Sequence, residues 1–300
     1  MMAYFRAGLF PCLILLQAAP CFADEPVWSA GELRFVIDTA GFRGQGSGAW
    51  QEVYTFLEAT QLDFRYDRGR PLAVIRMTMT IVDSSLKPFK QRSWTRRLTS
   101  KESKEQYESI PFRDITAVDL PPGSYGLSVT VEDVRTGVKG TAARRLDVAA
   151  VNEDLTLSDL LFSHEITKGD EGRFDKGAWK VVPNIDRHYA IGDPMKIYFE
   201  IYNLKEGKGE EAGLVLGYRL LDLDGKVVHH FDDSRVRKPG NRAAKVAELP
   251  TSDLSRGRYY LEVEAFDKAS QEYRTTRRLL KLGTGSMTVT RRLADDGTAG

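Results

Sequence analysis

The sequence predicts an all-β protein made of two tandem antiparallel β-sandwich domains. The first observation is an internal repeat of one strand, because residues 123–133 (GSYGLSVTVED) are similar in sequence to residues 257–267 (GRYYLEVEAFD). Each copy follows a Leu-Pro pair and precedes a gap of hairpin length and an Arg-Arg-Leu strand, at 144–146 and 277–279. The second observation is that many short segments alternate apolar with polar residues and have turn residues about every 8–12 positions, which is typical of sandwiches.

Residues 1–23 have the parts of a secretory signal peptide. Arg6 supplies the positive charge, residues 9–16 form a short apolar core, and small residues precede a cleavage site ahead of Asp24. The apolar run is too short to span a bilayer, which takes about 20 residues. We therefore expect an exported protein, periplasmic or extracellular, with no transmembrane segment in the mature chain.

Both cysteines, Cys12 and Cys21, lie inside the predicted signal peptide. The mature chain would then have no thiol for a disulfide or a metal site. Lipidation at Cys21 is the less favoured hypothesis, because Pro20 stands where a lipoprotein site has a small residue. The 43 Lys and Arg residues nearly balance the 42 Asp and Glu residues, so charge gives no reason to expect nucleic acid as a partner.

Strand patterns and composition divide the rest of the chain. The Arg-Arg-Leu strand of the first domain ends just before a short polar stretch, and the C-terminal residues are rich in Gly, Thr, Asp and Ala. The predicted parts are an extended lead-in (24–30), β-sandwich domain 1 (31–150), a linker (151–154), β-sandwich domain 2 (155–283) and a flexible tail (284–300).

Three segments inside these domains show the strand pattern most clearly. Residues 72–83 alternate Met77, Met79 and Ile81 with polar residues. Residues 197–202 (IYFEIY) are apolar on both faces, as in a strand buried centrally in a sandwich. Asp-Leu-Asp-Gly at 222–225 predicts a hairpin, because Asp-Gly supplies the positive φ that a tight turn needs.

A Gly-x-Tyr sequence begins both repeated strands and contains Tyr125 and Tyr259. It resembles the tyrosine corner of immunoglobulin-like sandwiches, in which the phenol forms a hydrogen bond to nearby backbone. We therefore predict that both tyrosines are structural and that the domains are immunoglobulin- or fibronectin-like.

Longer segments of both domains carry a further resemblance. In the second domain they are LSDL (157–160), FDKG (174–177), VPN (182–184) and YFEIYNL (198–204), and in the first YTF (54–56), IVD (81–83), LPPGSY (120–125) and VED (131–133). Together they resemble the β-sandwich region that precedes the GWxTD domain in GWxTD-domain-containing bacterial proteins. YFEIYNL is the most specific segment, and the namesake Gly-Trp-x-Thr-Asp motif is absent. The resemblance implies an exported bacterial protein and transfers no catalytic residue.

The sequence predicts no catalytic residue, no cofactor and no metal site. His229 and His230 are neighbours on a strand and point to opposite faces, so they cannot ligate one ion together. The glycine-rich segment 44–49 (GQGSGA) lacks the strand and helix that a dinucleotide site needs. The 42 acidic residues are scattered, and a carboxylate pair of the kind that a glycosidase uses stays open only as a minor alternative.

Two tryptophans are the predicted ligand-facing aromatic residues. Trp50 and Trp94 lie beside turn-like or charged stretches, and an exposed aromatic ring can stack on the apolar face of a sugar. Their exposure would favour a glycan ligand if both lay on one face.

These observations favour a non-enzymatic protein-interaction or scaffold module of the bacterial cell envelope, whose partner is another envelope protein or a glycan. A carbohydrate-binding or enzyme-accessory module is the alternative, and a carboxylate-dependent hydrolase is less favoured. Two tryptophans on one exposed face would favour the glycan, and a cleft with two facing acids would favour the hydrolase. A packed domain junction would favour a rigid scaffold, whereas an open groove would favour ligand binding.

Overall fold

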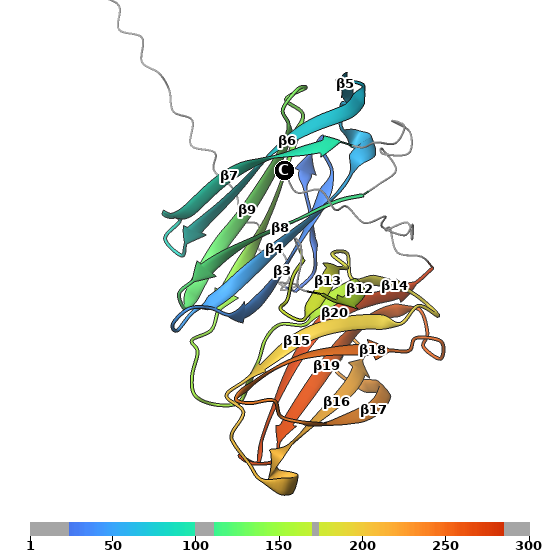
Figure 1. The fold of residues 1–300 in the computed structure, drawn as a ribbon. Coiled ribbons are helices and arrows are strands. Elements are labelled where there is room, and N and C mark those ends of the chain that lie inside the picture. Colours follow the sequence, from blue (N-terminus) through green and yellow to red (C-terminus); the bar gives the residue numbers. More distant parts are fainter. Residues whose placement is uncertain (1–23, 100–110, 170–173, 285–300) are drawn as a thin grey trace, which may run out of the picture.

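The computed structural model describes residues 24–99, 111–169 and 174–284, and nearly all of its elements are β-strands (Figure 1). Within these ranges the only helical elements are two short 3-10 turns. The prediction of an all-β antiparallel sandwich fold is confirmed. The predicted signal peptide (1–23) and all but the first residue of the predicted tail (285–300) lie outside the described residues.

The N-terminal half, residues 24–148, forms two sheets that enclose a common apolar core. One sheet has the order β1-β3-β4-β8, and the other has the order β2-β10-β9-β6-β5 with β7 also paired to β6. The strands are β1 (Val27–Trp28), β2 (Ala30–Gly31), β3 (Phe35–Arg43), β4 (Ala49–Glu58), β5 (Arg65–Asp67), β6 (Arg70–Asp83), β7 (Pro88–Thr99), β8 (Pro111–Leu120), β9 (Gly123–Asp133) and β10 (Lys139–Val148).

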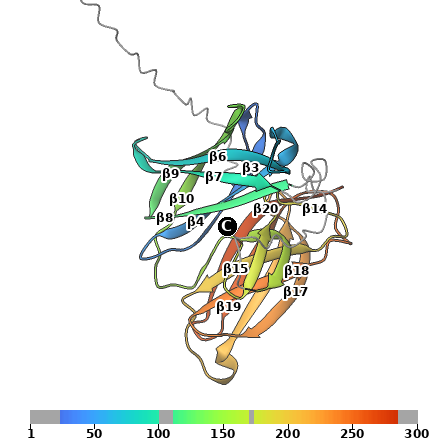
Figure 2. The same ribbon diagram turned by 45° about the horizontal axis from the view of Figure 1, so that its top comes forward.

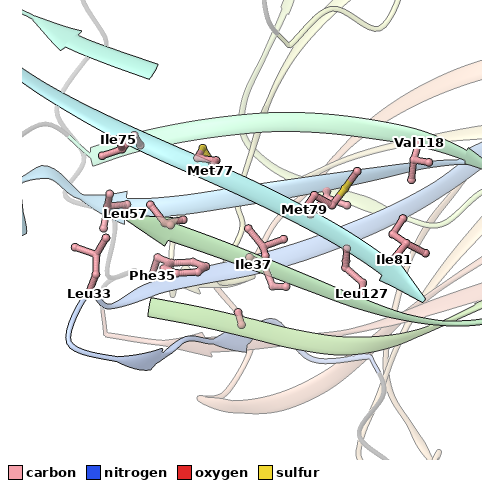
Figure 3. Packing of buried hydrophobic residues seen from close by; sticks show 14 of the residues in the cluster. Leu33, Phe35, Ile37, Leu57, Ile75, Met77, Met79, Ile81, Val118 and Leu127 are labelled. Carbon is pink, nitrogen blue, oxygen red and sulfur yellow. The ribbon is translucent and has the colours of Figure 1, made fainter. Parts of the chain in front are cut away.

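Alternate residues of these strands build the first core, as Figure 3 shows. On β6, the side chains of Ile75, Met77, Met79 and Ile81 are buried and point at β3 and β4, while the residues between them face outward. Burying each such side chain contributes about 1.5–3 kcal/mol. The alternation that predicted a strand over 72–83 is therefore the alternation that fills this core.

The C-terminal half, residues 155–284, also has two sheets around its own apolar core. Their orders are β11-β15-β12-β13, with β18 also paired to β15, and β14-β20-β19-β16-β17. The strands are β11 (Thr156–Leu157), β12 (Leu161–Lys168), β13 (Trp179–Pro183), β14 (His188–Ala190), β15 (Met195–Tyr202), β16 (Gly213–Leu221), β17 (Val227–Arg237), β18 (Arg242–Leu249), β19 (Gly257–Asp267) and β20 (Glu272–Gly283).

The two halves repeat the same strand order. β7-β6-β9-β10 in one sheet corresponds to β17-β16-β19-β20, and β3-β4-β8 corresponds to β12-β15-β18. The strands that the sequence writes twice, β9 and β19, form antiparallel hairpins with β10 and β20. One pair departs from the antiparallel pattern, because β14 lies parallel to β20.

A second repeated element, which the sequence comparison missed, is the turn that joins the first two strands of this order. Asp83 accepts hydrogen bonds from the N–H groups two and four residues ahead, at 2.8 and 3.0 Å. Asp222 does the same at 3.0 and 2.9 Å. The left-handed position of the turn is held by Leu86 (φ 61°) in the first half and by Gly225 (φ 84°) in the second.

We expect Leu86→Gly to raise the free energy of unfolding by about 1 kcal/mol. A left-handed conformation costs an L-residue roughly 1–2 kcal/mol, and glycine avoids this cost. Part of the gain is offset because glycine increases the conformational entropy of the unfolded chain. Leu86 is 72% exposed, so little apolar burial is lost. The reverse change, Gly225→Leu, should lower stability by a similar amount. Urea unfolding of both variants measures this, and a loss of stability in Leu86→Gly would contradict it.

The two halves meet through the outer faces of two sheets, with β3 and β4 lying against the C-terminal half (Figures 1 and 2). The residues that share this buried contact are Val36, Ala40, Phe42, Tyr54, Phe56, Leu161, Val181, Ile185 and Tyr198. The contact explains why the strand predicted at 197–202 is apolar on both faces. One face of β15 packs into its own core, and the other packs against the N-terminal half.

Candidate functional site

A buried group of charges lies within this junction. Asp38 projects from β3 on the face that meets the C-terminal half, where Arg187 donates to its two carboxylate oxygens from Nη2 and Nε at 2.6 and 2.8 Å. Arg278 of β20 donates to the same carboxylate from Nη2 at 3.2 Å. All three side chains are buried. A two-point Arg–carboxylate pair fixes orientation as well as distance, so this group sets how the halves are joined.

The N-terminal segment is bound to the same group. The Asp24 carboxylate accepts a hydrogen bond from the backbone N–H of Leu279 at 2.8 Å and one from Arg187 Nη1 at 3.2 Å. Arg187 Nη1 also donates to the carbonyl oxygens of Asp24 and Leu279. Residues from both ends of the described chain therefore converge on one guanidinium group.

Asp38 is held in its ionised form. Burial by itself raises the pKa of this carboxyl, but the attraction of Arg187 and Arg278 and the hydrogen bonds from Arg187 outweigh it and lower the pKa to about 2. The group is therefore a permanent anion at neutral pH, which suits a structural ion pair rather than a proton donor.

Another part of the junction opens into a groove of about 500 Å³. It lies between β4 of the N-terminal half and β15 and β18 of the C-terminal half. The lining residues are Phe42, Arg43, Trp50, Glu52, Lys176, Gly177, Ala178, Tyr198, Glu200, Arg242 and Ala244. The small residues Ala244 on β18 and Gly177 and Ala178 in the loop at 176–178 do not fill this space. A concave space lined by charged and aromatic side chains is where a ligand could bind, so the groove is the candidate functional site.

Glu52 is one of two carboxylates that line the groove. It accepts hydrogen bonds from the Lys176 ammonium and from the Tyr54 hydroxyl. The Lys176 Nζ atom also lies 3.6 Å from the centroid of the Phe42 ring, a cation–π contact. Burial lowers the pKa of Lys176, and the adjacent Glu52 opposes that shift. The carboxylate and the ammonium therefore bind each other across the two halves.

Glu200 is the second carboxylate, and it is bound just as fully. Its two oxygens accept hydrogen bonds from the hydroxyls of Tyr198 and Tyr202, at 2.6 and 2.7 Å, and from the guanidinium of Arg242. Burial would raise the pKa of Glu200, but these donors outweigh it and lower the pKa. The cleft thus contains two acids, and each already accepts hydrogen bonds from its own neighbours.

The structure separates the two tryptophans predicted to face a ligand. Trp50 lies on the rim of the groove and is 42% exposed. Trp94 lies on β7 in the other sheet, packs against the first core and donates its indole N–H to Asp114 at 2.9 Å. Trp28 is equally exposed (42%) on the same sheet face as Trp50, but it pairs with Val36 at the opposite end of β3.

The tyrosines predicted to be structural lie at equivalent places in the two halves. The Tyr125 hydroxyl donates to the carbonyl oxygen of Pro121 at 3.0 Å, and the Tyr259 hydroxyl donates to that of Ser255 at 3.1 Å. Each ring lies against the glycine that begins its strand, where a Cβ would come within 3.4 and 3.0 Å of the ring or hydroxyl. The Gly-x-Tyr pattern therefore has a steric reason in both halves.

Across residues 24–99, 111–169 and 174–284, no three His, Cys, Asp or Glu side chains gather in a way that could hold a metal ion. No helix in these ranges has the length and apolar character to span a membrane.

Most residues of the junction were not identified from the sequence. Asp38, Arg187 and Glu52 come from distant segments with no motif around them. Glu200 had a usable signal, because Tyr198, Glu200 and Tyr202 recur with the period of two that places side chains on one face of a strand. That period would have predicted one phenol–carboxylate group on β15, although not its neighbours across the junction.

Comparison with known proteins adds little to this geometry. No protein-family model matches the chain, and no curated protein matches it. Among solved structures, the chain is similar to one described as pT26-6p, at 9% identity and with a TM-score of 0.24. The similarity covers 89% of this chain and 67% of that one. A likeness this weak carries no argument about function.

Proposed function

We propose that the chain is an exported, non-enzymatic protein of two β-sandwich domains, which acts as a rigid protein-interaction or scaffold module of the bacterial cell envelope. The observation that supports this most is the junction, where Asp38, Arg187 and Arg278 are buried together beside an apolar contact. Joined domains move relative to each other unless their interface is large and apolar. A fixed junction presents the surfaces of both halves in one arrangement, as a scaffold requires.

The groove supports a binding role better than catalysis. A glycosidase needs one carboxyl that keeps a proton at working pH and one that is free to act on substrate or water. Glu52 and Glu200 are each occupied by a cation and by phenol hydroxyls. Neither is available for that chemistry, so the hydrolase is the least supported alternative.

A carbohydrate-binding or enzyme-accessory module is the second candidate. Trp50 and Arg242 are both exposed on the rim of the groove, and they would offer a sugar an apolar platform and hydrogen-bond donors. A single rim tryptophan supports this less well than a pair on one face would.

In-cell crosslinking of the tagged full-length chain, followed by mass spectrometry, tests the proposal. We expect one dominant envelope protein, recovered equally with the parent chain and with Trp50→Ala. Trp28→Ala is the matched control, because Trp28 is exposed to the same degree away from the groove. Retention on peptidoglycan or polysaccharide with no crosslinked protein, lost in Trp50→Ala but kept in Trp28→Ala, would overturn the proposal in favour of the glycan.

A further inference from the structure

β7 is a long edge strand at the rim of its sheet (Figure 1). It pairs with β6 without a register shift from Lys90 to Thr99, and the one irregularity lies before Lys90. Within the described residues, no strand pairs with its other edge. An edge of this kind presents a row of backbone N–H and C=O groups that another extended chain can pair with.

The inner face of β7 is mixed, because Trp94 and Leu98 pack against the first core while cations occupy the positions between and before them. Lys90, Arg92, Trp94 and Arg96 lie opposite core-facing residues of β6, so they share the inner face of the sheet. Lys90 and Arg92 are nevertheless exposed. Two exposed cations at alternate positions, Lys90 and Arg92, therefore lie at this end of the inner face, and the half-buried Arg96 lies beyond Trp94.

The equivalent strand of the C-terminal half is built differently. On the inner face of β17, Phe231 and Val236 pack against the second core. The pairing of β17 with β16 is also interrupted by two register shifts. Irregular pairing of this kind makes an edge a poorer template for a further strand. The contrast shows that the cations of β7 are not a requirement of the shared fold.

The charges of β7 are only partly balanced. Arg96 pairs with Asp114 at 2.9 Å, and Arg97 lies 3.6 Å from Asp67. Lys90 and Arg92 have no acidic partner among the residues that the structure describes, although the Arg92 guanidinium lies 5.7 Å from the centroid of the Trp94 ring. Like charges would face each other if two copies paired β7 with β7, so this edge disfavours self-association.

We propose that β7 binds an extended acidic segment of a partner protein as an added strand, with Asp or Glu at alternate positions opposite Lys90 and Arg92. Backbone pairing to the open edge would supply affinity, and the alternating charges would fix the face and the register. This inference rests on the proposed interaction function and names the surface and chemistry of the partner.

The test measures binding of a ten-residue peptide that alternates Glu with Val, by isothermal titration calorimetry with the full-length chain. We expect the double variant Lys90→Glu/Arg92→Glu to bind the peptide at least about tenfold more weakly. A peptide with Lys in place of Glu should bind that variant and not the parent. The matched control is Arg235→Glu/Arg237→Glu on β17, which makes the same charge change on the equivalent edge and should leave binding unchanged.

Backbone methylation separates strand addition from simple charge attraction. Two further peptides have N-methyl groups on one or the other alternate set of residues, since only one set of N–H groups in an added strand faces β7. We expect one to lose binding by about tenfold or more and the other to keep it. Equal binding of both, or no binding of the parent peptide, would overturn the inference. A crosslinked envelope protein still captured by Lys90→Glu/Arg92→Glu would then show that the proposed function stands while β7 is not its surface.

Discussion

Asp38→Asn is expected to lower the free energy of unfolding by about 3–5 kcal/mol, the range seen when one member of a buried ion pair is removed. The variant keeps the shape of the side chain but loses its charge. Arg187 and Arg278 would then stay buried beside a neutral amide, and both lie almost wholly out of solvent. Urea unfolding measures the loss directly.

Asp67→Asn provides the matched control for this change. Asp67 also faces an arginine, Arg97, but at 3.6 Å and with both side chains largely exposed. Exposed pairs contribute about 0–1 kcal/mol, so we expect little effect. Similar losses in the two variants would show that the buried group does not hold the halves together.

The same carboxylate gives stability a definite pH dependence. The folded pKa of Asp38, about 2, lies below its ordinary value of 3.8. The stabilisation is therefore complete above pH 4 and is lost as pH falls through the folded pKa. A shift of this size corresponds to about 2 kcal/mol. Between pH 5 and pH 2 the parent chain should lose more stability than Asp38→Asn, and parallel pH profiles of the two would contradict this assignment.

Asp267→Ala is expected to cost about 3 kcal/mol. Asp267, at the end of β19, is fully buried and accepts hydrogen bonds from the Lys238 ammonium at 2.6 Å and from the backbone N–H of Lys205 at 2.8 Å. Its removal leaves the Lys238 ammonium buried without its carboxylate and frees the loop at Lys205. Thermal or urea unfolding would measure the loss.

The equivalent residue of the first half isolates the contribution of the ammonium. Asp133 ends β9, is also buried, and accepts a backbone N–H from Asp63 at 2.8 Å and another from Arg135 at 2.9 Å. No lysine is buried against it in the described chain. Asp133→Ala should therefore cost only about 1–3 kcal/mol, the penalty for unsatisfied hydrogen bonds. A larger loss for Asp133→Ala than for Asp267→Ala would reverse this assignment.

Local pattern was enough to predict the hairpins but not the contacts between them. The strands beginning at Gly123 and Gly257 were found because residues that alternate in and out leave a regular trace in the sequence. The shared Asp turns were missed, because Leu86 replaces the glycine that marks Gly225 as a turn residue. A turn in which the Asp83 carboxylate accepts two backbone N–H groups tolerates leucine at this position, and the repeat is therefore not visible in the sequence.

The candidate site was harder to predict for a different reason. The alternation of residues along a strand shows which residues share a face of the sheet, but it does not show which two sheet faces pack together. Glu52 and Lys176 are joined only because the outer faces of two sheets pack together. Trp94, chosen for its charged neighbours, is instead held by Asp114 against a core. Its charged neighbours do not indicate exposure, because Arg96 lies on the same face and pairs with the same Asp114.

The position of Arg278 imposes an order on the folding of the growing chain. This residue lies on β20, the last strand in the described part of the chain, and it donates hydrogen bonds to the carbonyl oxygens of Thr39 on β3 and Leu160. Each hairpin can close as soon as its own residues have emerged, but the halves cannot lock until this guanidinium arrives. Until then Asp38 and the apolar outer face of the N-terminal half stay exposed to solvent. Exposed apolar surface favours aggregation, so the chain is most prone to misassembly during this interval.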